Sequence, residues 1–176
     1  MQFIFTHNAS LIRPLLSEVL QYLEELLIVE RTDTEDLLHR CKFIITELCT
    51  NAIKHSGEAK SILHIYTQEG TLIIKKTDTG KPFSSCMNNI DISFPLAPEI
   101  DTLVLMEDDI NRLNLQRVDD YNATFYAEQL NLPVAAGKRL NEHFGLVLIC
   151  LSADSFTYTH DPYDGSNIFI ASINLV

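Results

Sequence analysis

The chain has 176 residues, which is enough to bury a substantial core within one domain. Hydrophobic residues make up 46% and charged residues 21% of it, the balance of an ordinary globular protein. The formal net charge of −11 argues against nucleic acid or an anionic membrane as a direct partner, because both need clustered positive charge.

The N-terminal region predicts one strand followed by a long helix. Residues 2–6 are a short apolar run between Gln2 and Thr6, which reads as a strand. Asn8 or Ser10 is suited to cap the helix that follows. Leucine and valine then recur at helical spacing from Leu11 to Leu27, and this broad apolar stripe predicts a helix packed on the core.

A second helix is predicted from Thr34, with Thr32 or Thr34 as its cap, to about Ser56 and Gly57. Glu47, Asn51 and His55 lie four residues apart on it, so each step rotates by only about 40°. They form a polar stripe that could line a cleft, with a carboxylate to accept a proton and an amide oxygen suited to Mg²⁺. A solvated helix edge would have the same spacing.

Two strands are predicted next, at residues 61–68 and 71–77, joined as a hairpin at residues 69–70. Asp78 ends the second strand, and Gly80 lets the backbone turn close to a ligand. A carboxylate at that point can accept a hydrogen bond from an exocyclic amine such as that of adenine. Asp and Gly are also ordinary turn residues, so the pair alone is equally compatible with a plain turn.

A long segment from Ser84 to Leu140 separates these elements from the end of the chain. Residues 101–115 and 121–132 are each compatible with a helix, and Glu107, Asp108 and Asp109 are interpreted as a solvated face. No internal repeat or low-complexity linker divides the chain, so a single domain of residues 1–176 is predicted. The segment is expected to govern partner choice or lid closure rather than to hold the core together. The alternative is that its apolar residues pack permanently against the sheet.

The C-terminal region predicts a second hairpin. Residues 155–160 and 166–175 read as strands joined at residues 161–165. Strands at both ends of the chain with helices between them favour the α+β class. The expected architecture is a two-layer sandwich, a mixed, mostly antiparallel sheet covered by helices on one face.

The chain shows no pattern typical of export. Its start lacks the signal-peptide pattern, and no apolar run approaches the roughly 20 residues needed to span a bilayer. The cysteines lack CxxC or zinc-like spacing and are expected to be reduced thiols; they are Cys41, Cys49, Cys86 and Cys150. A cytoplasmic location is expected.

Three segments together resemble a known family. The run from Glu47 to His55 resembles the N box of the GHKL (histidine-kinase-like) ATPase superfamily, and the run from Asp78 to Phe83 resembles its first glycine box. Their forms, E-L-x-T-N-A-x-x-H and D-x-G-x-P-F, are similar to those of anti-sigma-factor serine kinases. The run from His143 to Ile149 resembles the end of the second glycine box.

The resemblance implies an ATP site with Mg²⁺ and gives each motif residue a role. Glu47 would be the general base, Asn51 the Mg²⁺ ligand, Asp78 the adenine reader and Gly80 the glycine of close approach. Lys54 would face phosphate. The remaining implied nucleotide-binding residues are His55, for which no role is derived, Phe83, Gly145 at a helix start that favours phosphate, and Leu146.

The chain departs from the family pattern in two places. Family members carry two or more glycines before the Leu-rich helix, whereas Asn141 to Phe144 stand here. Lys138 and Arg139 could supply positive charge instead of a glycine lid. The segment from Ser84 to Leu140 is longer than the lid of typical anti-sigma kinases, and is interpreted as an enlarged lid or a partner surface.

Two functional classes follow. The first is a serine/threonine protein kinase in partner switching. The second is a non-catalytic interaction module on the same fold with weak or no ATP turnover, which the incomplete second glycine box favours. In either class the expected protein partner is a sigma factor or an anti-anti-sigma-like regulator, and a homodimer is compatible with both. An unrelated α+β protein with chance motif matches remains the third alternative.

Overall fold

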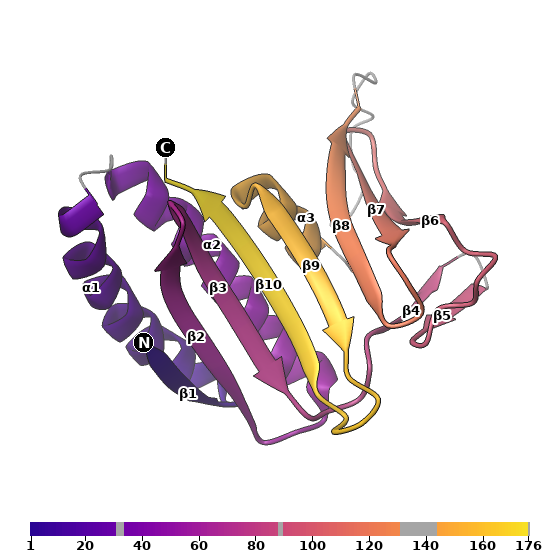
Figure 1. The fold of residues 1–176 in the computed structure, drawn as a ribbon, viewed down its shortest axis with the longest axis horizontal. Coiled ribbons are helices and arrows are strands. Elements are labelled where there is room, and N and C mark those ends of the chain that lie inside the picture. Colours follow the sequence, from indigo (N-terminus) through magenta and orange to yellow (C-terminus); the bar gives the residue numbers. More distant parts are fainter. Residues whose placement is uncertain (31–33, 88–89, 131–143, 176) are drawn as a thin grey trace.

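The computed structural model describes residues 1–30, 34–87, 90–130 and 144–175. Eight strands within these ranges form one sheet in the order β1-β2-β3-β10-β9-β8-β7-β6 (Figure 1). All pairings that the described residues make in this sheet are antiparallel. The predicted α+β class is therefore confirmed, with a purely antiparallel sheet in place of the mixed one expected.

The N-terminal elements match the sequence prediction. They are β1 (Gln2–Thr6), a short 3₁₀ turn η1 (Ala9–Leu11), α1 (Ile12–Glu30), α2 (Thr34–Asn51) and one π-helical turn η2 (Ala52–Ser56). The side chain of Asn8 caps η1 by accepting a hydrogen bond from Ser10 N at 2.9 Å. Gly57 ends η2 with a φ of 74°, a conformation that suits glycine.

Both predicted hairpins are present. The first joins β2 (Lys60–Gln68) to β3 (Thr71–Asp78), and the second joins β9 (Ser155–His160) to β10 (Asn167–Asn174). Glu69 and Gly70 form the first turn with φ values of 50° and 74°. Along β3 every second side chain is buried, from Leu72 to Asp78. Strand β3 therefore turns its Lys76 and Asp78 towards the same side as its apolar residues.

The helices considered for residues 101–115 and 121–132 are wrong. The segment forms β4 (Ser84–Met87), β5 (Ile90–Ser93), β6 (Thr102–Glu107), β7 (Asn111–Arg117) and β8 (Asn122–Gln129). Glu107 ends β6 and pairs with Arg112, and two aspartates close turns instead of forming a helix face. Asp108 accepts hydrogen bonds from the backbone of Ile110 and Asn111, and Asp119 accepts from that of Tyr121 and Asn122.

Strands β6, β7 and β8 belong to the core of the domain. Strand β8 pairs with β9, which joins the three strands to the main sheet. Leu113, Leu115 and Phe125 are buried, whereas Ile110 is 49% exposed. Leu105 and Met106 belong to the same core cluster. The expectation that this segment does not hold the core together is therefore wrong for β6 to β8. Residues 131–143 lie outside the described residues.

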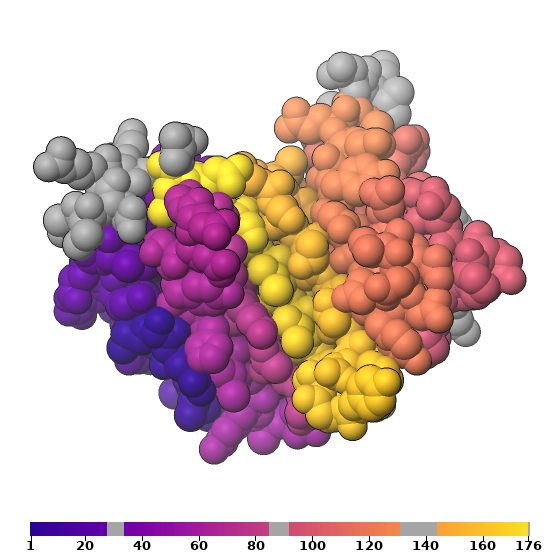
Figure 2. Space-filling view, viewed as in Figure 1, coloured from indigo at the N-terminus to yellow at the C-terminus, as the bar shows by residue number. Residues whose placement is uncertain are grey.

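The helices pack side by side. Helix α2 contacts α1 and also α3 (Phe144–Ser152), which contacts β7, β8 and β9. The face of the molecule seen in Figure 2 is formed largely by side chains of the strands. In the part of the chain that the structure describes, no helix combines the length and apolarity that crossing a membrane requires.

Candidate functional site

A cavity of about 550 Å³ opens where the ends of α2 and β3 meet the start of α3 and strand β10. It brings together most of the residues predicted from the motifs, namely Glu47, Asn51, Lys54, His55, Asp78, Phe83, Gly145 and Leu146. Other lining residues were missed by the sequence analysis, among them Ser56, Lys76, Lys81, Asn167 and Phe169. Lys138 and Arg139 lie outside the described residues.

One end of the cavity is formed by Glu47, Asn51 and Gly145. A side chain at Gly145 would overlap Glu47 Oε2, and its Cβ would lie 3.8 Å from Asn51 Oδ1. Gly145 is in the first turn of α3, where backbone N–H groups lack partners within the helix. The fold therefore places a carboxylate and an amide oxygen against a helix N-terminus from a distant part of the chain.

Glu47 is partly buried, and burial raises the pKa of its carboxyl above the ordinary value of 4.5. Lys54 acts in the opposite direction but more weakly. A carboxylate with a raised pKa is a stronger proton acceptor, which suits a general base. Lys54 and His55 are exposed at the rim of the cavity.

Asp78 is buried, with only 2% of its side chain exposed. Its Oδ1 accepts hydrogen bonds from Gly80 N at 3.1 Å and from Asn167 Nδ2 at 3.2 Å. Asn167 lies directly opposite Asp78 in the pairing of β10 with β3. Its Nδ2 also donates to Gly80 O at 2.8 Å and to Lys81 O at 3.1 Å. Asn167 therefore ties the start of the glycine-box-like loop to the sheet.

Tyr158 extends this network to the end of the loop. Its hydroxyl donates to Asn167 Oδ1 at 2.6 Å and accepts from Phe83 N at 2.9 Å. Burial raises the pKa of the Tyr158 hydroxyl, so it remains a proton donor at neutral pH. His160 Nδ1 lies 3.0 Å from the same Asn167 oxygen. Side chains of β9 and β10 thus fix both ends of the loop.

Lys76 forms an ion pair with Asp78 at the floor of the cavity. Its Nζ contacts Asp78 Oδ2 and lies 4.9 Å from the centre of the Phe169 ring. Only 5% of the Lys76 side chain is exposed. Asp78 Oδ2 is buried, and the ammonium group of Lys76 is its partner among the described residues. The sequence carried a signal for this pair, because Lys76 occupies an inward position in an alternating apolar strand.

Gly80 makes a close approach, but to protein backbone. A side chain there would overlap Ser56 O and place its Cβ 2.7 Å from the Ser56 carbonyl carbon. Lys81 N donates to the same Ser56 oxygen at 3.0 Å. Gly80 does not line the cavity. Glycine is required at position 80 because the loop packs there on the end of η2. The sequence had instead predicted a close approach of Gly80 to a ligand.

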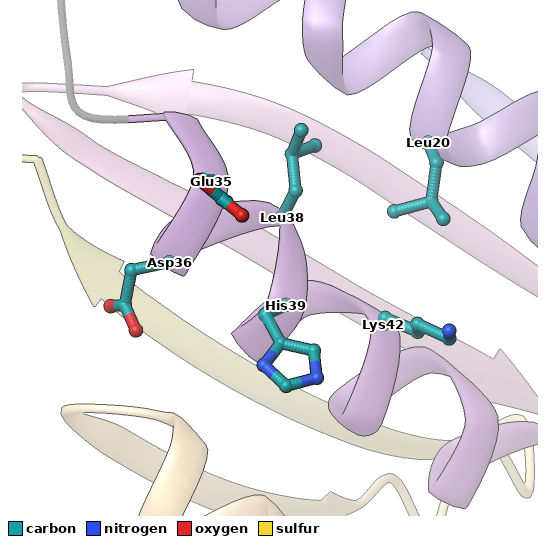
Figure 3. Close-up of a pocket in the computed structure, with 6 residues that line it drawn as sticks. All are labelled: Leu20, Glu35, Asp36, Leu38, His39 and Lys42. Carbon is teal, nitrogen blue, oxygen red and sulfur yellow. The ribbon is translucent and has the colours of Figure 1, made fainter.

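A second cavity of about 590 Å³ lies between α1 and α2. Figure 3 shows Leu38 and Lys42 on the side of α2 that faces Leu20, while Asp36 and His39 point away. The polar side chains therefore do not converge on one point. The cavity at Glu47 is the better candidate because its polar groups come from several elements and face one space.

Cys41, Cys49 and Cys150 are free thiols, as predicted. Burial raises the pKa of each to about 12, so these thiols stay protonated at neutral pH. The side chain of Cys86 lies outside the described residues.

Comparison of the chain with models of known protein families and with curated protein sequences gives no match. What the cavity can bind therefore has to follow from its own residues. These combine a partly buried carboxylate, an amide oxygen, a helix N-terminus and several lysines in one space.

Proposed function

We propose that this protein binds a Mg²⁺–nucleoside triphosphate, with ATP as the nucleotide, in the cavity bordered by Glu47, Asn51, Asp78 and Gly145. The proposal includes the histidine-kinase-like sandwich, with the helices on one face of the sheet. The observation that carries it is the convergence of these residues. They come from α2, the end of β3 and the start of α3, and line one cavity.

The charge of the cavity supports an anionic ligand. Lys54, Lys76 and Lys81 line it together with the two carboxylates Glu47 and Asp78. Positive charge therefore exceeds negative charge at this place, although the whole chain carries −11. A triphosphate would be attracted to such a site, and the N-terminus of α3 adds N–H groups that suit phosphate oxygens.

Asn51 supplies an amide oxygen that fits a magnesium ion whose other ligands are phosphates and water. The described residues contain no group of three or more His, Cys, Asp or Glu side chains able to hold a metal ion alone. Metal binding is therefore expected to depend on the nucleotide. Bound Mg²⁺ would neutralise charge on the phosphates, and Glu47 would accept the proton of an attacking hydroxyl.

The proposed activity is that of a cytoplasmic serine/threonine protein kinase in partner switching, with a sigma factor or an anti-anti-sigma-like regulator as its protein partner. A second candidate is a non-catalytic interaction module that keeps the nucleotide site. A homodimer is compatible with both candidate functions. The observation that favours the second is the lack of adjacent glycines before α3, where Phe144 and Gly145 begin the helix.

Isothermal titration calorimetry of ATP with and without Mg²⁺ tests the binding proposal. Asn51→Ala is expected to weaken binding about 10-fold or more in Mg²⁺ and much less without it, because it removes the amide oxygen. The matched control is Asn174→Ala, which changes an exposed side chain on β10. An affinity for ATP that changes neither with Mg²⁺ nor with Asn51→Ala would contradict the proposed site. Absence of ATP binding to the wild type would contradict the proposed function.

A further inference from the structure

The base-binding end of the cavity does not offer Asp78 as a free acceptor. Asp78 Oδ1 already accepts from Gly80 N and Asn167 Nδ2. Asp78 Oδ2 is buried and contacts the ammonium group of Lys76. An exocyclic amine entering this end would therefore have to compete with Lys76 for the carboxylate.

The ammonium group and an exocyclic amine compete for the same oxygen because both are hydrogen-bond donors. Lys76 is the stronger competitor, since it carries a full charge and is already in place. Its side chain is held by burial and by the Phe169 ring, 4.9 Å from Nζ. Moving it away would separate two buried opposite charges and leave the ammonium group without its carboxylate, which is strongly unfavourable.

We propose that Lys76 lowers the selectivity for adenine by keeping Asp78 from the exocyclic amine of that base. As folded here, the cavity then binds a nucleotide through its phosphates, with little selection for the amine. This inference rests on the proposed nucleotide binding and departs from the role that the family resemblance gives to Asp78. Lys76 acts as an internal substitute for the amine at the floor of the site.

The test compares ATP with purine riboside triphosphate, which lacks only the exocyclic amine. Affinities of both are measured by calorimetry in Mg²⁺, and their ratio reports contact with the amine. The wild type is expected to bind the two within about 3-fold. Lys76→Met should raise the preference for ATP to about 10-fold or more, the typical effect of a hydrogen bond to a charged group.

The double variant Lys76→Met with Asp78→Asn is the matched control. It removes both charges together, so no buried charge is left unpaired. Because an amide oxygen is a weaker acceptor than a carboxylate, the ratio should fall back towards the wild-type value. If the double variant preferred ATP as strongly as Lys76→Met does, the increased preference would not come from Asp78, and the inference would be overturned.

Measurements on the wild type distinguish a failure of the role of Lys76 from a failure of the proposed nucleotide binding. A wild-type preference of 10-fold or more for ATP overturns the role of Lys76 and leaves nucleotide binding intact, whether or not any variant folds. A folded Lys76→Met variant without increased preference also overturns it. If no binding of ATP, purine riboside triphosphate or tripolyphosphate to the wild type is detected, the proposed function is refuted, and the inference is refuted with it.

Discussion

Asn167 is expected to be the side chain on which the order of the glycine-box-like loop depends most. It is 2% exposed and stands opposite Asp78 in the β10–β3 pairing. Its amide donates to Asp78 Oδ1, Gly80 O and Lys81 O, and its oxygen accepts from Tyr158 OH. Asn167→Ala removes all of these bonds in one step.

The loss can be estimated from these contacts. A hydrogen bond contributes about 0.5–1.5 kcal/mol net, and a bond to a charged group contributes about 1.5–3 kcal/mol. Asn167 also lines the cavity, so water could enter and satisfy part of what remains. We therefore expect Asn167→Ala to lower the free energy of unfolding by about 2–4 kcal/mol. For a domain of this size, that loss lowers Tm by roughly 5–15 °C.

Urea and thermal unfolding at neutral pH measure this difference. Asn174→Ala is the matched control, because it makes the same substitution at an exposed position of the same strand. The control is expected to change the free energy of unfolding by less than about 0.5 kcal/mol. If Asn167→Ala cost no more than Asn174→Ala, the network would contribute nothing to stability and the reasoning would be refuted.

Two further predictions concern Glu47 and strand β7. Burial raises the pKa of Glu47 above 4.5, so its ionisation opposes folding as pH rises through the folded-state pKa. Glu47→Gln should therefore raise Tm at about pH 7 but not at about pH 3, where the wild-type carboxyl is protonated in both states; an equal change at both pH values would contradict this. Leu113→Ala should lower the free energy of unfolding by about 2–5 kcal/mol in urea denaturation, because Leu113 is fully buried. The exposed Ile110→Ala should cost about 0.5 kcal/mol or less, and equal losses would show that β7 is not part of the core.

Local patterns sufficed for the elements that bracket the candidate site. Helical spacing identified α1 and α2, and strand alternation with short turns identified both hairpins. These signals are local, because each reports a period or a turn within a few residues. The same locality placed Glu47 and Asn51 on one side of α2, and both line the cavity.

The segment between the two hairpins could not be assigned from local patterns. Residues 101–115 mix leucines and acidic residues in a way that also suits a helix. Asp108 instead closes a turn, and β7 gains its hydrogen bonds from β6 and β8. Short apolar runs are ambiguous because strand pairing depends on partners elsewhere in the chain, which a local period does not report.

The chemistry of the cavity floor was decided by tertiary structure. The amino-acid sequence by itself determined that Lys76 and Asp78 share one face of β3, because strand side chains alternate. It did not determine that β10 would bring Asn167 opposite Asp78, since that register joins residues far apart in the chain. Nor did it determine that Lys76 would lie on Asp78 Oδ2, because the two charges pair where the packing of the whole domain removes both from water.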